Sequence, residues 1–131
     1  MNPTLILFVK QLQALTAFYR DVFALHTIRE TDDLALLQLG HGEMAFRVLL
    51  HAIPAHIAAT IVIVQPPVRR DDSAMKLSLP VSSLAQARAR ALALGGVVDA
   101  VEREWDYEGR RVVDGNDPEG NVIQLHEAIS A

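Results

Sequence analysis

Gln124 and His126 are the residues of this chain whose types and spacing could most directly carry chemistry. They lie two positions apart in the alternating segment Val122–His126, so both side chains project from the same face of the expected strand. An imidazole can ligate a metal or transfer a proton, whereas a glutamine side chain offers only a neutral amide. Two interpretations of His126 stay open. One is a metal ligand or proton carrier, and the other, which we favour, is a hydrogen-bonding or solvent-exposed histidine.

Arginines in the expected strands add a second chemistry, the binding of a carboxylate or phosphate. Arg47 lies in one such strand, and Arg110 and Arg111 lie in another. Adjacent strand residues point to opposite faces, so at most one of Arg110 and Arg111 can reach a shared cavity. We take Arg111 as the candidate, and exposure to solvent is the ordinary alternative for each arginine.

Trp105 is the single tryptophan of the chain. It lies in the segment Glu104–Gly109, just before the strand that carries the paired arginines. An aromatic side chain there could stack on a flat or cationic ligand. The alternative is that the indole packs over the edge of the sheet.

The elements that must position these residues follow a strand–helix–strand–strand–strand order that occurs twice. In the first half the helix, about Leu12 to Phe23, shows apolar residues at helical spacing. In the second half Ser83 and Gln86 form a capping-box pattern before a helix that ends at Gly95-Gly96. The expected strands are Leu5–Val9, Leu25–Glu30, Leu34–Leu39, Met44–Leu50, Lys76–Val81, Val97–Val101, Arg110–Asp114 and Val122–His126.

The two halves predict an N-terminal module of about residues 1–52 and a C-terminal module of about residues 75–131, within a single domain. A connecting segment of about residues 53–74 separates them. It contains a further apolar stretch, Ala58–Gln65, which we interpret as an additional strand without a place in the repeat.

Alternation along the strands predicts which side chains face a ligand. In the first strand Leu5, Leu7 and Val9 face the helix, which leaves Phe8 on the other side. The same alternation in the strand that opens the second half leaves Lys76 on the side away from the helix. A surface that mixes apolar residues with a few polar groups suits a small organic molecule.

Two motifs together carry a family resemblance. The turn Asp117-Pro118-Glu119-Gly120-Asn121 precedes the last strand, and Phe18–Leu25 follows closely behind the apolar run Leu5–Val9. The chain thereby resembles the glyoxalase / bleomycin-resistance / dioxygenase superfamily, also called the vicinal oxygen chelate proteins. The resemblance implies an α+β fold in which two βαβββ modules form a curled mixed sheet around a cavity, with the helices outside. It also implies a glycine where the first helix stops; this chain has Ala24, which must avoid positive φ or carry strain.

The resemblance further implies where the ligands stand in metal-using members. Those positions fall on Thr4, Lys76, Gln124 and about Phe46, with Arg47 taking the last place if the register shifts by one. Gln124 stands where a glutamate is usual, and the ammonium of Lys76 would repel a dication by roughly 8 kcal/mol at about 4 Å and an effective dielectric near 20. The imidazole and carboxylate ligands that divalent metals prefer are missing. We therefore expect no metal and no other cofactor.

The favoured hypothesis is a protein that binds a small organic molecule and is closest to the metal-independent, bleomycin-resistance-like members. The alternative is a glyoxalase-type lyase or isomerase, or a thiol transferase that modifies an antibiotic, with relocated metal ligands. We assign no catalytic residue and leave open whether the chain is an enzyme. A third hypothesis is a structural or regulatory module with a vestigial cavity. The ligand-binding candidates are Phe8, Phe46, Lys76, Trp105, Arg111, Gln124 and His126.

Composition narrows the class of partner. With 131 residues, half of them hydrophobic, the chain can bury a sizeable core. Its net charge of −4 argues against nucleic acid and is compatible with a cationic small ligand. The absence of cysteine excludes disulfides and thiolate sites. Neither a signal peptide nor an apolar run long enough to span a bilayer is visible, so we expect no membrane partner and a cytoplasmic location. The resemblance implies a homodimer, whose modules pair within one chain or exchange between two.

Overall fold

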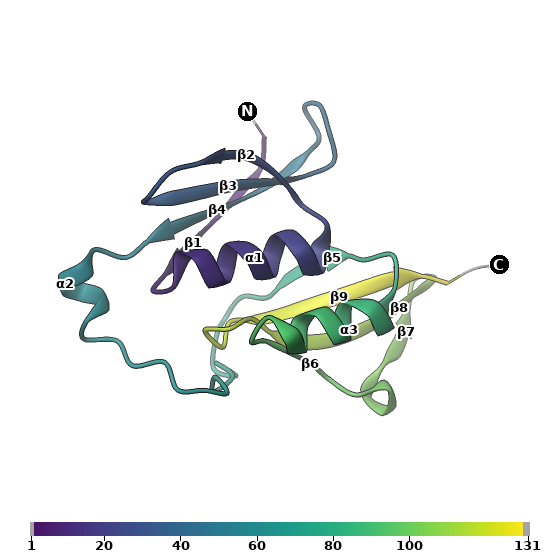
Figure 1. Ribbon diagram of the computed structural model, residues 1–131. Helices are drawn as coiled ribbons and strands as arrows, with labels where there is room; N and C mark the ends of the chain where they lie inside the picture. The colour runs from purple at the N-terminus through teal and green to yellow at the C-terminus, as the bar shows by residue number, and fades with distance from the viewer. Residues whose placement is uncertain (1, 130–131) are drawn as a thin grey trace.

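The structure is a computed structural model that describes residues 2–129. The chain forms two modules joined by a long connecting segment (Figure 1). None of the helices in this part of the chain is long and apolar enough to cross a membrane. In chain order the elements are β1 (Thr4–Val9), α1 (Leu12–Phe23), β2 (His26–Glu30), β3 (Leu34–Leu39), β4 (Phe46–Ala52), α2 (Ala55–Ala58), β5 (Leu77–Pro80), α3 (Leu84–Ala93), β6 (Val97–Val98), the 3-10 turn η1 (Val101–Arg103), β7 (Trp105–Tyr107), β8 (Arg110–Asn116) and β9 (Val122–Ala128).

The first sheet has the strand order β1-β4-β3-β2 and carries α1 on one face. β1 runs parallel to β4, and the other pairs are antiparallel. α1 forms where the sequence predicts it, because its apolar residues recur at the helical period and can be buried together. The residues of α1 and of this sheet that belong to the hydrophobic core include Leu15, Phe18, Tyr19, Val22, Ala35, Leu37, Val48 and Leu50.

The second sheet has the order β5-β9-β8-β6, with the short strand β7 paired to β8. α3 covers one face of this sheet, where Ile123 and Leu125 of β9 are almost fully buried. The hydroxyl of Ser83 accepts the backbone N–H of Gln86 at 3.1 Å, so the predicted N-terminal cap of α3 is confirmed. The sequence did not predict β7 as a strand.

The helices of the two modules meet and share one hydrophobic core. α1 contacts β3, β4 and α3, and α3 contacts β6 and β9; Figure 1 shows α1 lying between the first sheet and the second module. The predicted α+β fold with two βαβββ modules is confirmed. The two sheets do not, however, curl together around a cavity within the chain. Burying α1 against α3 removes apolar surface from water, and it leaves the helix-free face of each sheet exposed.

The predicted strand at Ala58–Gln65 is wrong. Ala58 is the last residue of the short helix α2, and the chain then continues without regular structure to β5. Its amides bond locally instead of to a sheet: the N–H of Thr60 bonds to the carbonyl of Ile57, and that of Ile61 to the carbonyl of Ala58, each at 3.0 Å. A run of apolar residues is equally compatible with a strand and with an irregular segment that packs on a core. Composition alone could not decide between these two structures.

Ala24 ends α1 in the left-handed region, with φ 53°. The sequence predicted that a non-glycine residue at this position would either avoid positive φ or carry strain. The structure shows the strained alternative, since the left-handed conformation costs an alanine roughly 1–2 kcal/mol.

Asp117 joins the two motifs on which the family resemblance depends. Its buried carboxylate accepts the hydroxyl of Tyr19 at 2.7 Å, which ties the turn before β9 to the middle of α1. It also accepts the backbone N–H groups of Glu119 and Asn121 and the side-chain amide of Asn121, at 2.8–3.0 Å. Burial raises the pKa of this carboxyl even though four hydrogen bonds favour its charged form. The sequence predicted the turn but not this contact.

Glu119 caps α1 from the opposite end of the chain. Gln11, at the N-cap position, makes no side-chain capping bond of its own. Instead, the buried carboxylate of Glu119 accepts the backbone N–H groups of Lys10 and Gln11 at 2.7–2.9 Å. A negative charge at a helix N-terminus satisfies unpaired donors and interacts favourably with the helix dipole. The turn before β9 therefore orients both α1 and the last strand.

Candidate functional site

The helix-free face of the second sheet, which we call the open face, gathers four of the predicted ligand-binding residues. Gln124 pairs with Ser78 of β5 and with Asp114 of β8. His126 pairs with Pro80 and with Val112, which in turn pairs with Trp105 of β7. Side chains paired in this way point to the same side of a sheet. Lys76, the residue just before β5, joins them through its ion pair with Asp114. The predicted residues on the open face are thus Lys76, Trp105, Gln124 and His126.

His126 is held by Arg110, which lies on the same face. The Nε–H of Arg110 donates to Nδ1 of His126, and its Nη2–H donates to the His126 carbonyl at 3.3 Å. Burial, followed by the nearby positive charge of Arg110, lowers the pKa of the imidazole. The neutral ring therefore has Nδ1 as acceptor and carries its proton on Nε2. In this state His126 offers an N–H donor to the open face.

This arrangement predicts a pH dependence of stability. The unfolded chain binds a proton on this imidazole near the ordinary pKa of 6.5, and the folded chain binds it only at lower pH. The stability contributed by the neutral ring is therefore fully present above pH 6.5 and is lost as the pH falls through the folded-state pKa. An NMR titration of the histidine C–H resonances checks this. The Arg110→Gln variant should titrate at higher pH than the wild type, and a wild-type His126 pKa at or above 6.5 would contradict the assignment.

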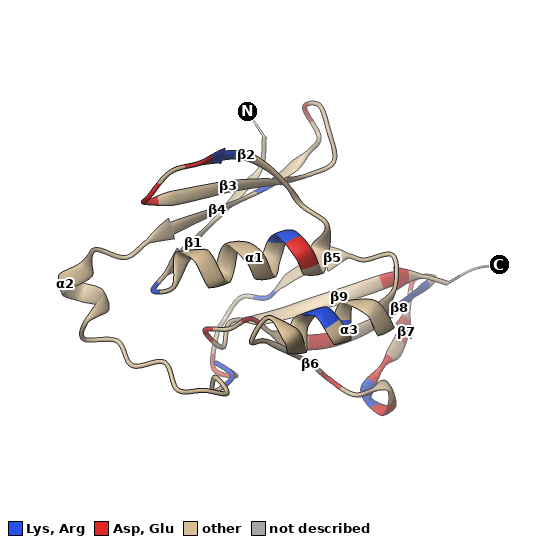
Figure 2. Cartoon of the chain, viewed as in Figure 1, with Lys and Arg blue, Asp and Glu red and all other residues tan. Residues whose placement is uncertain are grey.

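Two further pairs of polar side chains lie on the open face. The ammonium of Lys76 lies 3.1 Å from both carboxylate oxygens of Asp114. The hydroxyl of Ser78 donates to Oε1 of Gln124 at 2.8 Å. These contacts leave the side-chain NH2 group of Gln124 to point donors at a ligand. Lys, Arg, Asp and Glu residues occur in both modules (Figure 2). The ion pair between Lys76 and Asp114 is therefore a local contact and not part of a charged surface of one sign.

The first sheet also has a helix-free face, and it is mainly apolar. Phe8 is 64% exposed and Ile6 is 53% exposed on β1. The predicted candidate Phe46 does not lie there, because it packs against the core on the helix side of the sheet. Arg47, the predicted alternative to Phe46, lies beside Thr4 on the helix-free face, with its Nε–H bonded to Oε1 of Gln38 at 2.7 Å.

Arg111 does not join the site either. It lies on the helix side of β8 and pairs with the carboxylate of Asp106 at 3.0 Å, near the exposed end of the β7–β8 hairpin. Arg110, and not the predicted Arg111, faces the site. The prediction that only one of Arg110 and Arg111 faces the site did not say which one. Asp114 pairs with Gln124, and counting back from Asp114 in steps of two residues along the strand leads to Arg110. Asp114 and Tyr107 are further residues of this face that the sequence reasoning missed.

The residues at the family's metal positions do not fit a divalent cation. Thr4 donates its hydroxyl to the carbonyl of Asn2 at 3.0 Å, and Arg47 and Lys76 bring positive charges. His126 cannot replace them without losing its bond to Arg110, because a metal on Nε2 would move the ring proton to Nδ1, opposite the Arg110 N–H. No group of three or more His, Cys, Asp or Glu side chains that could hold a metal occurs among residues 2–129.

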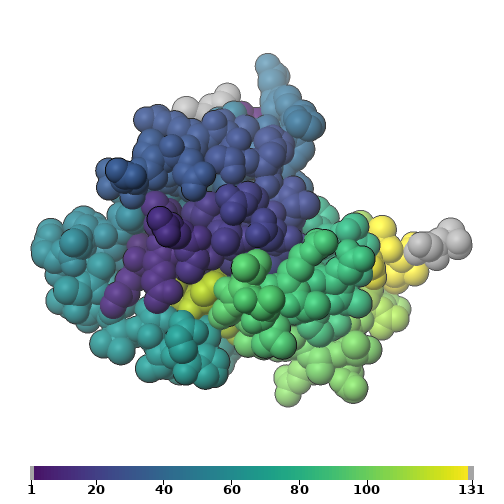
Figure 3. Space-filling view, viewed as in Figure 1, coloured from purple at the N-terminus to yellow at the C-terminus, as the bar shows by residue number. Residues whose placement is uncertain are grey.

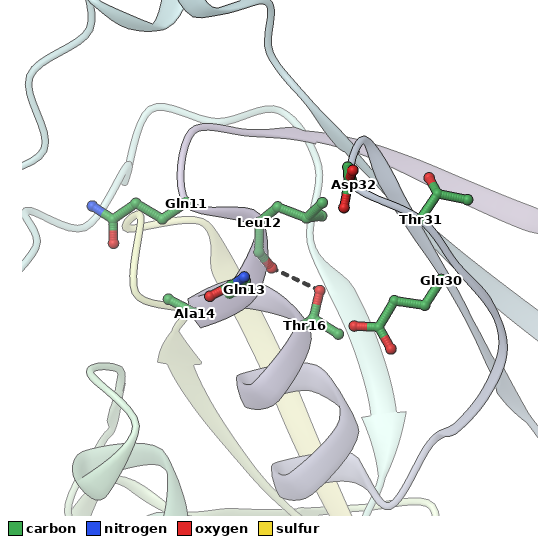
Figure 4. Close-up of a pocket in the computed structure, with 8 residues that line it drawn as sticks. All are labelled: Gln11, Leu12, Gln13, Ala14, Thr16, Glu30, Thr31 and Asp32. Atoms are coloured by element: carbon green, nitrogen blue, oxygen red, sulfur yellow. Dashed lines mark hydrogen bonds between the residues drawn. The ribbon is translucent and has the colours of Figure 1, made fainter.

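A separate hollow of about 710 Å³ lies between the start of α1 and the β2–β3 loop (Figure 4). It contains none of the predicted site residues. Its carboxylates, Glu30 and Asp32, are exposed, and the hydroxyl of Thr16 donates to the carbonyl of Leu12 at 2.7 Å. Because no charged group in it is buried and held in place, we do not place the site there.

A smaller and more apolar hollow, of about 340 Å³, adjoins the open face of the second sheet. It lies between β1 and β5, and it reaches the open face at Lys76 and Val122. Both strands have one edge without a partner strand in the described structure. The apolar side chains that line it are Leu5, Ile6, Leu7, Met75, Leu77, Val122 and Ile123.

Residues 4–126 match the family model described as "Glyoxalase-like domain". No curated protein matches the sequence at a significant level.

Solved structures share the fold at low sequence identity. A glyoxalase/bleomycin resistance protein/dioxygenase family enzyme from Burkholderia phytofirmans PsJN has a TM-score of 0.64 at 16% identity, with 96% of this chain and 97% of that chain covered. The genomically encoded fosfomycin resistance protein FosX from Listeria monocytogenes has a TM-score of 0.61 at 17% identity, covering 98% and 91%. Lactoylglutathione lyase from Agrobacterium tumefaciens has a TM-score of 0.55 at 22% identity, covering 95% and 91%.

Proposed function

From the premise that this chain belongs to the glyoxalase-like domain family, we propose that it binds a small organic molecule on the open face of its second sheet. The proposal does not include the divalent metal common in the superfamily, because the residues at those positions are Thr4, Lys76, Gln124 and either Phe46 or Arg47. It makes the chain similar to the metal-independent, bleomycin-resistance-like members.

One observation carries the proposal: aromatic side chains and fixed polar donors occur side by side on the open face. Trp105 and His126 are the cross-strand neighbours of Val112 on its two sides. Arg110 is hydrogen-bonded to His126. A ligand site of this type needs apolar contact area together with a few polar groups whose directions are already set. Such groups lose little conformational freedom when a ligand binds, which raises affinity.

A second copy of the chain is expected to complete the site. Among the described residues, no helix or sheet of the same chain covers the open face of the second sheet. On the helix-free face of the first sheet, Ile6 and Phe8 are exposed. Contiguous exposed apolar surface of this type is typical of protein–protein contacts. We therefore propose a homodimer in which the first sheet of one subunit covers the open face of the other. Phe8 would then be a ligand-binding residue supplied by the partner.

The alternative function is a glyoxalase-type lyase or an antibiotic-modifying transferase with relocated ligands. It has less support, since those reactions use a metal-polarised substrate and a carboxylate that moves protons. On the open face the carboxylate of Asp114 is paired with Lys76, and Nδ1 of His126 is occupied by Arg110. We also retain a cytoplasmic location and a single-domain organisation, with modules of about residues 1–52 and 75–131, as parts of the proposal.

The first test combines metal content with assembly. The purified protein is incubated with Ni, Zn, Mn and Fe, desalted and analysed by elemental mass spectrometry, and its mass is measured by native mass spectrometry. We expect a dimer without stoichiometric metal. A tightly held metal at one per chain would overturn the metal-free part of the proposal, and a monomer would overturn the shared site.

The second test concerns ligand binding itself. Because Trp105 is the single tryptophan of the chain, its fluorescence reports on the open face alone. A library of small aromatic compounds should contain members that change this fluorescence in a saturable way. If none does, a binding site on this face is contradicted.

A further inference from the structure

Arg110 carries a positive charge that no carboxylate balances. None of the salt bridges found among the described residues involves Arg110. Its hydrogen-bond partners are a neutral ring nitrogen and a backbone carbonyl, both of His126. Neither partner neutralises a guanidinium. Arg111, the next residue along the strand, is paired with Asp106.

The contacts of Arg110 fix its orientation without using all of its donors. Nε–H and one Nη2–H are bonded to His126. A guanidinium has five N–H donors, so the outer edge formed by Nη1 and the second Nη2–H remains for a ligand. Two parallel N–H groups at that edge match the two oxygens of a carboxylate or the oxygens of a phosphonate.

The surroundings of Arg110 favour an anion that has an aromatic or other flat apolar body. Tyr107 is the direct cross-strand partner of Arg110, and Trp105 lies two residues away on the same face. The nearest acidic residue of this face, Asp114, is already neutralised by Lys76 at 3.1 Å. A cation placed here would therefore meet Arg110 without a free carboxylate to compensate.

From this geometry we infer that the ligand of the open face is a small organic anion, a carboxylate or phosphonate on a flat apolar body, and that Arg110 binds its charged group. The inference rests on the proposed function and adds the chemical class of the ligand and the residue that selects it. It replaces the expectation from net charge, which was compatible with a cation. The net charge of the chain, −4, sets the long-range attraction of ions. The charged groups that contact the ligand decide whether the bound ligand is an anion or a cation.

The experiment compares three probes that share one ring and differ in charge at neutral pH: benzoate, benzyl alcohol and benzylamine. Binding is followed by Trp105 fluorescence and by the indole N–H resonance. The variants are the wild type, Arg110→Gln and Arg111→Gln. The two substitutions remove the same charge from neighbouring positions of β8 on opposite faces, so Arg111→Gln is the matched control. A glutamine at position 110 can still donate to Nδ1 of His126, and thermal melts of all three proteins confirm folding.

We expect the wild type to bind benzoate about tenfold or more tightly than benzyl alcohol, with benzylamine weakest. Arg110→Gln should lose this preference, and Arg111→Gln should keep it. Equal or tighter binding of the alcohol or the amine by the wild type would overturn the anion inference and leave the proposed function standing. A preference that survives in Arg110→Gln, or disappears in Arg111→Gln, would overturn the role of Arg110. If no probe perturbs Trp105 in the wild type, the proposed function and this inference are both contradicted.

Discussion

Replacing Asp117 by alanine is expected to lower the free energy of unfolding by about 3–5 kcal/mol. The carboxylate is fully buried and accepts four hydrogen bonds. Its removal leaves the buried hydroxyl of Tyr19 and the backbone N–H groups of Glu119 and Asn121 without partners. Each unsatisfied buried group costs about 1–3 kcal/mol, and the sum is reduced because the turn can relax. Denaturant unfolding, fitted with a common slope, measures the loss.

Two further variants locate the cause. Asp117→Asn keeps an oxygen that can accept both backbone N–H groups and removes a carboxylate whose pKa burial has raised, so its loss should be about half that of the alanine variant or less. Because the folded-state pKa is raised, the native protein loses stability relative to Asp117→Asn as the pH rises through that pKa. Asp114→Ala, which breaks only the exposed pair with Lys76, should cost less than about 1 kcal/mol. If Asp117→Ala and Asp114→Ala lose the same stability, the anchoring role of Asp117 is wrong.

Replacing Gly120 by alanine is expected to destabilise the chain by about 3 kcal/mol or more. Gly120 has φ +85°, and a Cβ there would lie 2.1 Å from the backbone carbonyl oxygen of Val68. The added methyl group therefore meets both backbone strain and a backbone atom that cannot rotate away. The connecting segment is fastened at this point, because the N–H of Arg70 donates to the Gly120 carbonyl at 2.8 Å. In Figure 3 the connecting segment (teal) lies next to the surface of the chain that leads into β9.

Gly109 provides the matched control for that substitution. Its φ is +74°, but a Cβ there would meet nothing within 4 Å. Gly109→Ala should therefore cost only the strain of the left-handed backbone, about 1 kcal/mol. The difference between the two variants measures the clash with Val68. Limited proteolysis should also cut the connecting segment faster in Gly120→Ala. Equal losses in the two alanine variants, with unchanged proteolysis, would show that Val68 does not pack against Gly120 as the structure has it.

Much of the fold could be predicted from the sequence, because it depends on short-range patterns. The bounds of α1 and β3 and the N-cap Ser83 follow from apolar periodicity and capping chemistry. The bounds of the other strands agree within a few residues. The prediction of a strand at Ala58–Gln65 was wrong, because the apolar residues of this stretch do not alternate with polar ones. The three-residue strand β7 was too short to give a pattern of its own.

The candidate site was less predictable, since it depends on which face of each strand is open. Lys76, Trp105, Gln124 and His126 share the open face of the second sheet, whereas Phe46 and Arg111 point to the helix side. An error of one position reverses the face of a strand residue. Register between β8 and β9, not the sequence of either strand, decides that Arg110 meets His126.

By itself the sequence determined two βαβββ modules, the family, and the poor match of the usual metal positions to a divalent cation, because each of these can be read from residue types at local spacing. Only the tertiary structure decided the contacts that join distant parts of the chain. Asp117 binds the hydroxyl of Tyr19, which lies 98 residues earlier in the sequence. Glu119 caps α1 across a separation of 108–109 residues. The physical reason is that side-chain hydrogen bonds act over about 3 Å in space, and no local pattern records which distant atoms the packing of two modules brings within that range.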